Sequence, residues 1–444
     1  MAVQVGNRAV VLGASMAGLL AARVLAEAYQ EVLIVERDGL GASGPRRGVP
    51  QGRHVHGLLA RGQQILEELF PGFTQDAIDA GIPTGDLGEL RWYFNGRRLR
   101  PATTGLICIS GSRPLLESRV RARVQELAGV KILERHDIAA LVTDEAHSRV
   151  TGVRVQQGEG GEPYTLEADL VVDATGRGSR TPVWLEEFGY GRPTEDRIHI
   201  DLSYTTRRFR LPDESILRGD LSINPVSSPS HPRGAFFSRI EDGLCVLSLT
   251  GVLGDRAPTD LEGFLAWTRT LPVPDVHEVI ADAEPVGEGV TFRYPASIRR
   301  RYERMERFPD RLLVLGDAVC SFNPVYGQGM TVATLEALVL RDHLRRGTPV
   351  PLRFLRDIAG VIDVAWDFSA GGDLGYPEVE GRRTAKVRMG GVYMAKLQAA
   401  ATQDSSVTST FMKVAGFVEP PQALMSPRMV YRVLRGAKQA ALTA

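Results

Sequence analysis

The chain has 444 residues, of which 43% are hydrophobic and 24% are charged, and its formal net charge at pH 7 is zero. This length predicts two or three structural units, and the balanced charge gives no support for a nucleic-acid partner. The three cysteines are widely spaced and form no CxxC pair, which predicts no metal site and favours a reducing cytoplasm. We expect neither a signal peptide nor an integral membrane segment, because no stretch approaches about 18 apolar residues.

The first pattern along the chain is a strand, a glycine turn, a helix and a second strand. The segments are residues 8–12 (RAVVL), 13–18 (GASMAG), 19–28 (LLAARVLAEA) and 31–38 (EVLIVERD). Gly13 permits the tight turn and Gly18 the close packing of helix on strand, so a dinucleotide pyrophosphate is expected at the helix N-terminus. Glu36 follows Gly13 by 23 residues (36 − 13), close to the roughly 20 expected for a carboxylate that binds a ribose hydroxyl. A carboxylate there favours a free 2′-hydroxyl, as in NAD or FAD.

Two features modify this nucleotide site. Ser15 replaces the usual middle glycine, which adjusts the approach to the pyrophosphate without excluding it. The basic, glycine-rich segment from Arg46 to His56 then follows the second strand and is the best candidate for a mobile functional loop. It can hold the pyrophosphate, admit a nicotinamide phosphate or cover a flavin. His54 and His56 lack accompanying acidic or cysteine ligands, so we expect a cofactor-facing or structural role rather than a metal pair.

The third informative block is RLLVLGDAVCSFNPVYGQGM, residues 311–330. It predicts a buried strand over 312–315, a break at Gly316 and Asp317, a loop through Pro324, and a helix from 331 onward. An acid at a strand end can bind a sugar hydroxyl. Glycines just before a helix let backbone N–H groups approach an anionic or electron-rich ring. Read alone, the block is also compatible with an ordinary strand-to-helix turn.

The remaining chain alternates between sheet-like and helical segments. Residues 168–190 (ADLVVDATGRGSRTPVWLEEFGY) predict a strand over 170–172 and a turn over 173–179, and residues 191–300 hold several strand-like runs. A hairpin is expected where Trp92, Tyr93 and Phe94 precede Asn95-Gly96. From about residue 350 onward the sequence predicts helices, with a glycine-rich break at 371–372.

The basic end of the chain allows two interpretations. Val430, Leu434 and Ala437 recur at helical spacing among arginines and lysines. We expect a solvated helix that packs on the body through this short apolar face. A helix lying on a membrane surface is the alternative.

Taken together, the three blocks resemble FAD-dependent monooxygenases of the para-hydroxybenzoate hydroxylase fold, over most of residues 1–345. The phrases PRRGVPQGRHVHGLL and DATGRGSRTPVWLEEFGY resemble, more narrowly, bacterial natural-product epoxidases and hydroxylases of the polyether type. Geranylgeranyl reductases and flavin-dependent halogenases share much of the pattern, and the DATGR motif resembles these two families more than the hydroxylases. Halogenation is disfavoured because the chain has no Trp-x-Trp.

The resemblance implies an α/β fold and a division into domains. A Rossmann-like FAD-binding domain of the glutathione-reductase type would comprise residues 1–75, 102–190 and 301–349. A mixed β-sheet substrate domain, residues 76–101 and 191–300, would interrupt it, and a helical C-terminal region would span 350–444. Five aromatic residues are candidates for the substrate pocket, although packing in the sheet core explains each equally well: Trp92, Phe94, Phe237, Phe292 and Tyr294.

The resemblance also assigns cofactor roles. The residues expected to bind FAD are Gly13, Ser15, Met16, Ala17, Gly18, Glu36, Arg37, Arg113, Gly316, Asp317, Pro324, Gly327, Gly329 and Met330. Arg113 would lie near the phosphate and ribityl chain, although its position also suits a surface arginine at a helix start. Asp317 would bind a ribityl hydroxyl. Pro324, Gly327 and Gln328 would lie beside the ring, and the backbone N–H groups of 327–330 would stabilise negative charge at flavin N1 and O2.

The implied activity is a monooxygenase reaction, in which a flavin C4a-hydroperoxide epoxidises or hydroxylates a small apolar polyketide- or terpenoid-like substrate. O2 would be the co-substrate, and the reductant would be transiently bound NAD(P)H or a separate flavin reductase. No catalytic side chain is expected, because the cofactor performs the oxygen chemistry. The alternatives are a flavin-dependent reductase of the geranylgeranyl reductase kind and a non-enzymatic FAD-binding protein.

Overall fold

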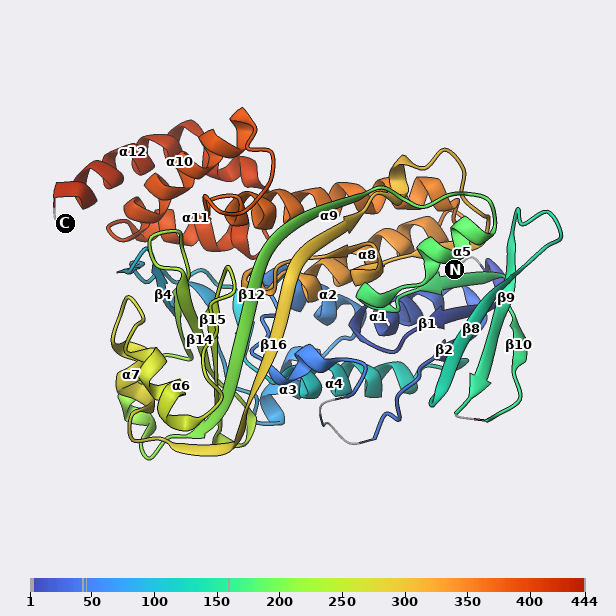
Figure 1. Cartoon of the computed structure of the whole chain (residues 1–444), viewed down its shortest axis with the longest axis horizontal. Helices are drawn as coiled ribbons and strands as arrows, with labels where there is room; N and C mark the ends of the chain where they lie inside the picture. The colour runs from blue at the N-terminus through green and yellow to red at the C-terminus, as the bar shows by residue number, and fades with distance from the viewer. Residues whose placement is uncertain (1–3, 42–43, 45, 159, 443–444) are drawn as a thin grey trace.

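The computed structural model describes residues 4–41, 44, 46–158 and 160–442, so Pro45 of the PRRG motif and the last two residues of the C-terminal region lie outside the described residues. Two sheet-based halves are joined by two long strands, and a layer of C-terminal helices lies along one side (Figure 1). This arrangement confirms the predicted α/β class, with a parallel sheet of the Rossmann-like kind, a second sheet and a helical C-terminal segment.

The first half is built on a five-stranded parallel sheet of order β17-β11-β1-β2-β7. Its strands are β1 (Gly6–Leu12), β2 (Tyr29–Val35), β7 (Val130–Leu133), β11 (Leu170–Asp173) and β17 (Leu312–Val314). The central strands are unbroken apolar runs because helices and other segments cover both faces of a parallel sheet. Helix α1 (Met16–Leu25) joins β1 to β2 and packs against α8 (Gly329–Leu344). The strand, turn, helix and strand predicted for residues 8–38 are confirmed.

A small antiparallel sheet extends this half at the end opposite the second half of the molecule (Figure 1). It consists of β8 (His136–Thr143), β9 (Val150–Gln157) and β10 (Tyr164–Glu167). A further pair of short strands, β3 (Thr84–Asp86) and β6 (Ile107–Ile109), forms a two-stranded sheet.

The second half is an eight-stranded sheet of order β18-β16-β12-β15-β14-β13-β4-β5. Its strands are β4 (Arg91–Phe94), β5 (Arg97–Arg98), β12 (Glu195–Arg210), β13 (Ser222–Val226), β14 (Arg233–Arg239), β15 (Cys245–Gly251), β16 (Glu284–Arg300) and β18 (Cys320–Ser321). The predicted hairpin at Asn95-Gly96 joins β4 to β5, and both turn residues have positive φ (51° and 71°). The long strands β12 and β16 pair with one another and connect the two halves (Figure 1).

Helices complete the architecture. The helices not yet given are α2 (Ala60–Leu69), α3 (Phe73–Asp79), α4 (Arg113–Gln125), α5 (Thr181–Glu187), α6 (Leu261–Thr268), α7 (Asp275–Ile280), α9 (Pro351–Asp373), α10 (Ala385–Ala401), α11 (Ser405–Ala415) and α12 (Pro427–Leu442). Helices α6 and α7 cover the far face of the second sheet and close a separate core there. Helix α9 runs through Gly371 and Gly372 to Asp373, so the expected glycine break is the end of a helix. Within the described residues, no helix combines the length and apolarity needed to cross a membrane.

The buried face of α12 differs from the predicted one. The helix buries Met429, Val433, Gly436 and Ala440, whereas Leu434 is 50% exposed. Gly436 lies against α10 so closely that an added Cβ would sit 2.8 Å from the Cβ of Ala400. The expectation that Val430, Leu434 and Ala437 form the packing face was therefore wrong for Leu434, whereas Val430 and Ala437 are partly buried at the margin of the observed face.

Gly18 provides a test of the packing between α1 and the turn before it. An added Cβ would lie 1.9 Å from the carbonyl oxygen of Gly13, a backbone atom that cannot yield cheaply. We expect Gly18→Ala to destabilise the protein by about 1–3 kcal/mol and to reduce retention of the FAD that the sequence predicts, measured by denaturant unfolding and by the flavin content after gel filtration. Gly390→Ala, at an open position of α10, is the control and should leave both quantities unchanged or raise stability slightly. Unchanged stability in Gly18→Ala would contradict this close packing.

Candidate cofactor and substrate site

The register of the parallel sheet brings four turns to one edge. Leu12 pairs with Val35 and with Asp173, and Asp173 pairs with Val314, so the strands end together. The turns that follow these ends line a cavity of about 650 Å³. This volume is typical of a small-molecule or cofactor site.

The cavity gathers most of the residues that the sequence assigned to a cofactor. All of the predicted FAD-binding residues line it except Gly18, which lies beneath the turn of Gly13. Gln328 also lines it, and its buried side-chain oxygen has no hydrogen-bond partner among the described residues. Their individual contacts with FAD stay predictions.

The N-terminus of α1 is left open toward this cavity. Ser15 occupies the N-cap position, but its hydroxyl makes no cap hydrogen bond to its own helix. Ser15 Oγ instead donates to Glu117 Oε2 (2.9 Å) and accepts from Arg113 Nη2 (2.9 Å). The helix also has no acidic residue in its first turn. Its first N–H groups and its positive dipole end therefore suit a phosphate group.

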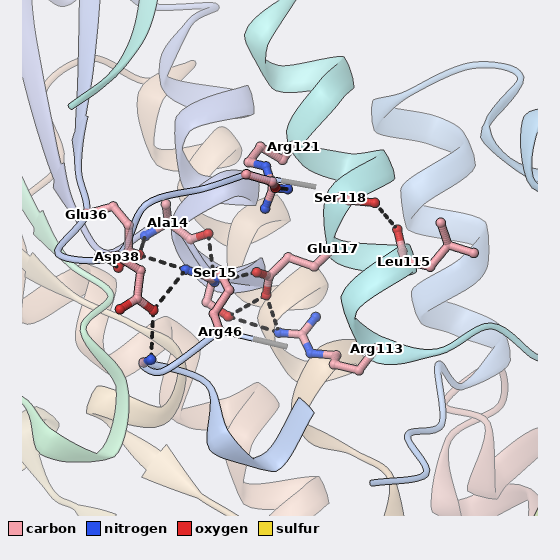
Figure 2. Close-up of polar contacts among 12 residues, drawn as sticks. Ala14, Ser15, Glu36, Asp38, Arg46, Arg113, Leu115, Glu117, Ser118 and Arg121 are labelled. Atoms are coloured by element: carbon pink, nitrogen blue, oxygen red, sulfur yellow. Dashed lines mark hydrogen bonds and ion pairs between the residues drawn. The ribbon is translucent and has the colours of Figure 1, made fainter. Parts of the chain in front are cut away.

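A buried network of alternating charges surrounds this helix end (Figure 2). Glu36 Oε2 accepts a hydrogen bond from the backbone N–H of Ala14 (2.8 Å) and lies 3.1 Å from Arg46 Nη1. The other guanidinium nitrogen of Arg46 pairs with Glu117, which also lies 2.9 Å from Arg113 Nη2. The network therefore holds two guanidinium groups near the helix end, and guanidinium is well suited to binding a pyrophosphate.

Glu117 was not predicted from the sequence. Its one available signal was the i, i+4 spacing from Arg113 on α4, which is common to many surface ion pairs. Its burial (4% exposed) became visible only in the fold.

The turn after β11 is organised by a fully buried carboxylate. Asp173 accepts hydrogen bonds from the backbone and hydroxyl of Thr175 and from the hydroxyls of Ser179 and Thr181. This fixed turn places the guanidinium of Arg177 over the ring of Tyr294, 4.6 Å from its centroid, on the cavity wall. The sequence identified the turn but not the role of Arg177.

Asp317 lies on the cavity wall after β17. Burial raises the pKa of its carboxyl, whereas Arg113, Arg177 and Arg300 oppose that rise. The preceding Gly316 has a φ of +66°, and an added Cβ would lie 2.7 Å from Ala17 Cβ. Its N–H donates to Glu336 Oε2 (2.5 Å) on α8, and burial raises the pKa of Glu336 to about 8.

The loop beside α8 is held by the end of α9. Asp373 Oδ1 accepts from Asn323 Nδ2 (2.7 Å) and from the hydroxyl of Tyr326 (3.2 Å). The loop between these two residues contains Pro324, which lines the cavity with Gly327. Burial raises the pKa of Asp373 to about 7, against the effect of these two hydrogen bonds.

The aromatic residues expected in the substrate pocket divide into two groups. Phe292 and Tyr294 on β16 line the cavity, together with Tyr204 on β12, which was not predicted. Phe237 lies instead in the core behind the sheet, and Trp92 and Phe94 pack near α11, where Phe94 contacts Phe411. None of these three residues lines the cavity, which contradicts their assignment to the pocket. The side chain of Phe237 points to the opposite face of the sheet. Trp92 and Phe94 lie on β4, near the edge of the sheet remote from β12 and β16.

His54 and His56 both line the cavity. His56 Nδ1 donates to the carbonyl of His54 (3.0 Å). Burial, together with a smaller effect of Arg53 and Arg113, lowers the pKa of His54 to about 4 and that of His56 to about 3. Both rings are therefore neutral at pH 7 and face the cavity from the segment that the sequence predicted to be functional.

Comparison with known proteins identifies the family. A sequence profile described as "FAD dependent oxidoreductase" matches residues 9–183. "Protein Rv3254" of Mycobacterium tuberculosis is 40% identical over 367 residues, which cover 77% of this chain and 74% of that protein. The chain belongs to the FAD-dependent oxidoreductase family.

Two more distant similarities extend across most of the oxidoreductase. Kynurenine 3-monooxygenase of Salinispora arenicola is 29% identical over 358 residues, covering 76% of this chain and 72% of that protein. The crystal structure of a flavoprotein/dehydrogenase from Cytophaga hutchinsonii has the same fold, with a TM-score of 0.69, 16% identity and coverage of 98% and 99% of the two chains.

The cofactor of the oxidoreductase is FAD, and the described residues fit it. The open helix end and the buried arginines suit the pyrophosphate. The close approach of Gly316 to Ala17 leaves no room there for a side chain, so backbone can border the cofactor directly. The unpaired oxygen of Gln328 offers a further polar contact.

Asp317 tests the predicted ribityl contact. We expect Asp317→Ala to weaken FAD binding roughly 10- to 100-fold, because a buried hydrogen bond to the ribityl chain would be lost. Fluorescence titration of the apoprotein with FAD measures this change. Asp282→Ala, at an exposed position, should bind FAD as the wild type does. Equal affinity in Asp317→Ala would remove Asp317 from the site.

Asp373 tests the support of the loop through pH. The pKa of about 7 in the folded protein exceeds the ordinary 3.8, so the folded state binds a proton more tightly than the unfolded chain. The resulting stabilisation is full below about pH 3.8 and is lost as the pH rises to about 7. We expect the melting temperature of Asp373→Asn to fall less than that of the wild type between pH 5 and pH 8.

The matched control is Asp367→Asn, which lies on the same helix and pairs with Lys386 at the surface. Differential scanning calorimetry of the three proteins should show the wild-type pH dependence in this control. The same pH dependence in Asp373→Asn would refute a titration of Asp373 in this range.

Proposed function

We propose that the oxidoreductase is an FAD-dependent monooxygenase that hydroxylates or epoxidises a small apolar molecule. The observation that supports this most is the continuity of one cavity, from Glu36 at the ribose end to the aromatic wall of Tyr204, Phe292 and Tyr294. A substrate against that wall would lie next to the loop of Pro324 and Gly327. The sequence similarity to kynurenine 3-monooxygenase favours the same class of reaction.

The bound FAD would supply the redox chemistry, which includes activation of O2 and delivery of one oxygen atom. The chain would position and shield it. The N–H groups at the start of α8 would stabilise negative charge on the ring, helped by the helix dipole. The apolar wall would exclude water from the reacting atoms.

The proposal includes a source of electrons. NAD(P)H would bind transiently, or a separate flavin reductase would supply reduced flavin. The largely aromatic wall suits a polyketide- or terpenoid-like substrate, and this finer assignment rests on the shape and composition of the cavity alone.

A flavin-dependent reductase is the second candidate. It is favoured by the fold similarity to a protein described as a flavoprotein/dehydrogenase and by the DATGR wording of the turn that carries Arg177. Such an enzyme would use the same FAD site without inserting oxygen.

Isotope labelling separates the two candidates. FAD-loaded protein, NADPH and a general flavin reductase are incubated under ¹⁸O2 with a panel of polyene and aromatic polyketides. We expect one ¹⁸O atom in the product, detected by mass spectrometry, and no label when ¹⁸O is supplied as water. Product that forms without O2 and carries no label would establish the reductase instead.

A further inference from the structure

The segment carrying His54 is attached to the substrate sheet through two hydroxyl groups. His54 Nδ1 lies 2.7 Å from Thr206 Oγ1 on β12, and Thr206 Oγ1 lies 2.5 Å from Ser248 Oγ on the neighbouring strand β15. Ser248 Oγ also accepts a hydrogen bond from the backbone N–H of Val55 (3.0 Å). All three side chains are buried.

The direction of these hydrogen bonds follows from counting donors. If Ser248 donates to Thr206 and Thr206 donates to His54 Nδ1, both hydroxyl hydrogens have an acceptor. In the reverse direction, Thr206 would donate to Ser248. The hydroxyl hydrogen of the fully buried Ser248 would then have no other acceptor among the described residues. Buried donors are rarely left unpaired, so the first direction holds and Nδ1 is an acceptor.

The tautomer of His54 is fixed by this direction. The ring is neutral at pH 7, because burial and Arg53 lower the pKa of His54 to about 4. A neutral imidazole carries one N–H, and an accepting Nδ1 places that hydrogen on Nε2. Within the part of the chain that the structure describes, Nε2 has no hydrogen-bond partner.

The ring lies in the aromatic wall of the cavity. Its centroid is 5.8 Å from that of Tyr204 and 5.7 Å from that of Phe292, and all three residues line the cavity. A fixed donor in a largely aromatic wall gives orientation and specificity to a ligand that carries a matching acceptor.

We propose that His54 Nε2–H is the hydrogen-bond donor that orients the substrate, which is therefore an apolar molecule carrying an acceptor oxygen, such as a carbonyl or ether. This rests on the proposed function, because it takes the aromatic end of the cavity as the substrate end. His54 belongs to this end, since its partners are residues of the sheet. The backbone donors at the start of α8 lie at the predicted flavin-ring end.

The tautomer is measured directly by ¹⁵N NMR of FAD-loaded protein labelled at histidine, with the His54 signals assigned from a His54→Gln variant. We expect an unprotonated Nδ1 and a protonated Nε2. Thr206→Val removes the hydroxyl that donates to Nδ1 and should shift the His54 ring signals, whereas Thr206→Ser keeps the hydroxyl and should retain the wild-type pattern. A protonated Nδ1 in the wild type would overturn the proposal.

The ligand class is measured with two probes that differ in one acceptor oxygen, 2-acetylnaphthalene and 2-ethylnaphthalene. Perturbation of the flavin absorbance in FAD-loaded protein gives their dissociation constants. We expect the wild type to bind the ketone about three- to tenfold more tightly, and His54→Phe to abolish this preference. His54→Gln, which keeps an N–H at a similar distance, should retain part of it.

A ketone that binds no more tightly than the hydrocarbon, or a preference that persists in His54→Phe, would refute the assignment. The flavin content of each variant distinguishes a protein that has not folded from one that has lost only the donor. If His54→Phe does not fold, the ketone preference and the His54 ring signals of Thr206→Val test the proposal instead. Neither measurement requires turnover. A negative ¹⁸O2 experiment would thus refute the monooxygenase reaction while leaving the role of His54 to these two tests.

Discussion

The common ending of four parallel strands is the constraint on which the site depends. Because β1, β2, β11 and β17 are paired in register, the turns after Leu12, Val35, Asp173 and Val314 lie side by side at one sheet edge. Each turn then contributes a different group to one cavity. In chain order these are the open N-terminus of α1, the carboxylate of Glu36, the guanidinium of Arg177 and the carboxyl of Asp317. A slip of one residue in any pair would move one turn by about 3.3 Å relative to its neighbours, so the register of these strands also sets the geometry of the site.

The sequence predicted the parts of this site that depend on local chemistry. A glycine turn between an apolar strand and a helix has few alternatives, and the spacing of Glu36 from Gly13 follows from the length of one strand–helix–strand unit. The same holds for Gly316 and the glycines before α8, where the backbone itself borders the cavity. Each of these features is encoded within about 30 consecutive residues, so it can be recognised from the sequence without knowledge of the fold.

The proposed substrate end could not be predicted in the same way, because its residues meet only through long-range pairing. Thr206 and Ser248 are unremarkable polar residues on strands until β12 and β15 pair and the loop of His54 lies on them. The sequence alone does not distinguish an aromatic residue that faces a cavity from one that faces a core. For this reason Phe237 was assigned to the pocket although it lies in the core. The packing face of α12 was predicted wrongly for a related reason, since the close contact of Gly436 with Ala400 of α10 depends on long-range packing.

Alternation along β15 and β12 separates two kinds of position on the same strand. Ser248 faces the His54 segment, whereas its neighbours Leu247 and Leu249 lie in the second core beneath α6 and α7. Tyr204 likewise faces the cavity, while Phe209 on the same strand belongs to that core. Substitutions can therefore change the shape and polarity of the cavity while the residues that stabilise the sheet stay the same. Such a scaffold is able to diverge in the molecules it accepts without first losing its stability, which makes the cavity-facing positions the natural ones to vary in directed evolution.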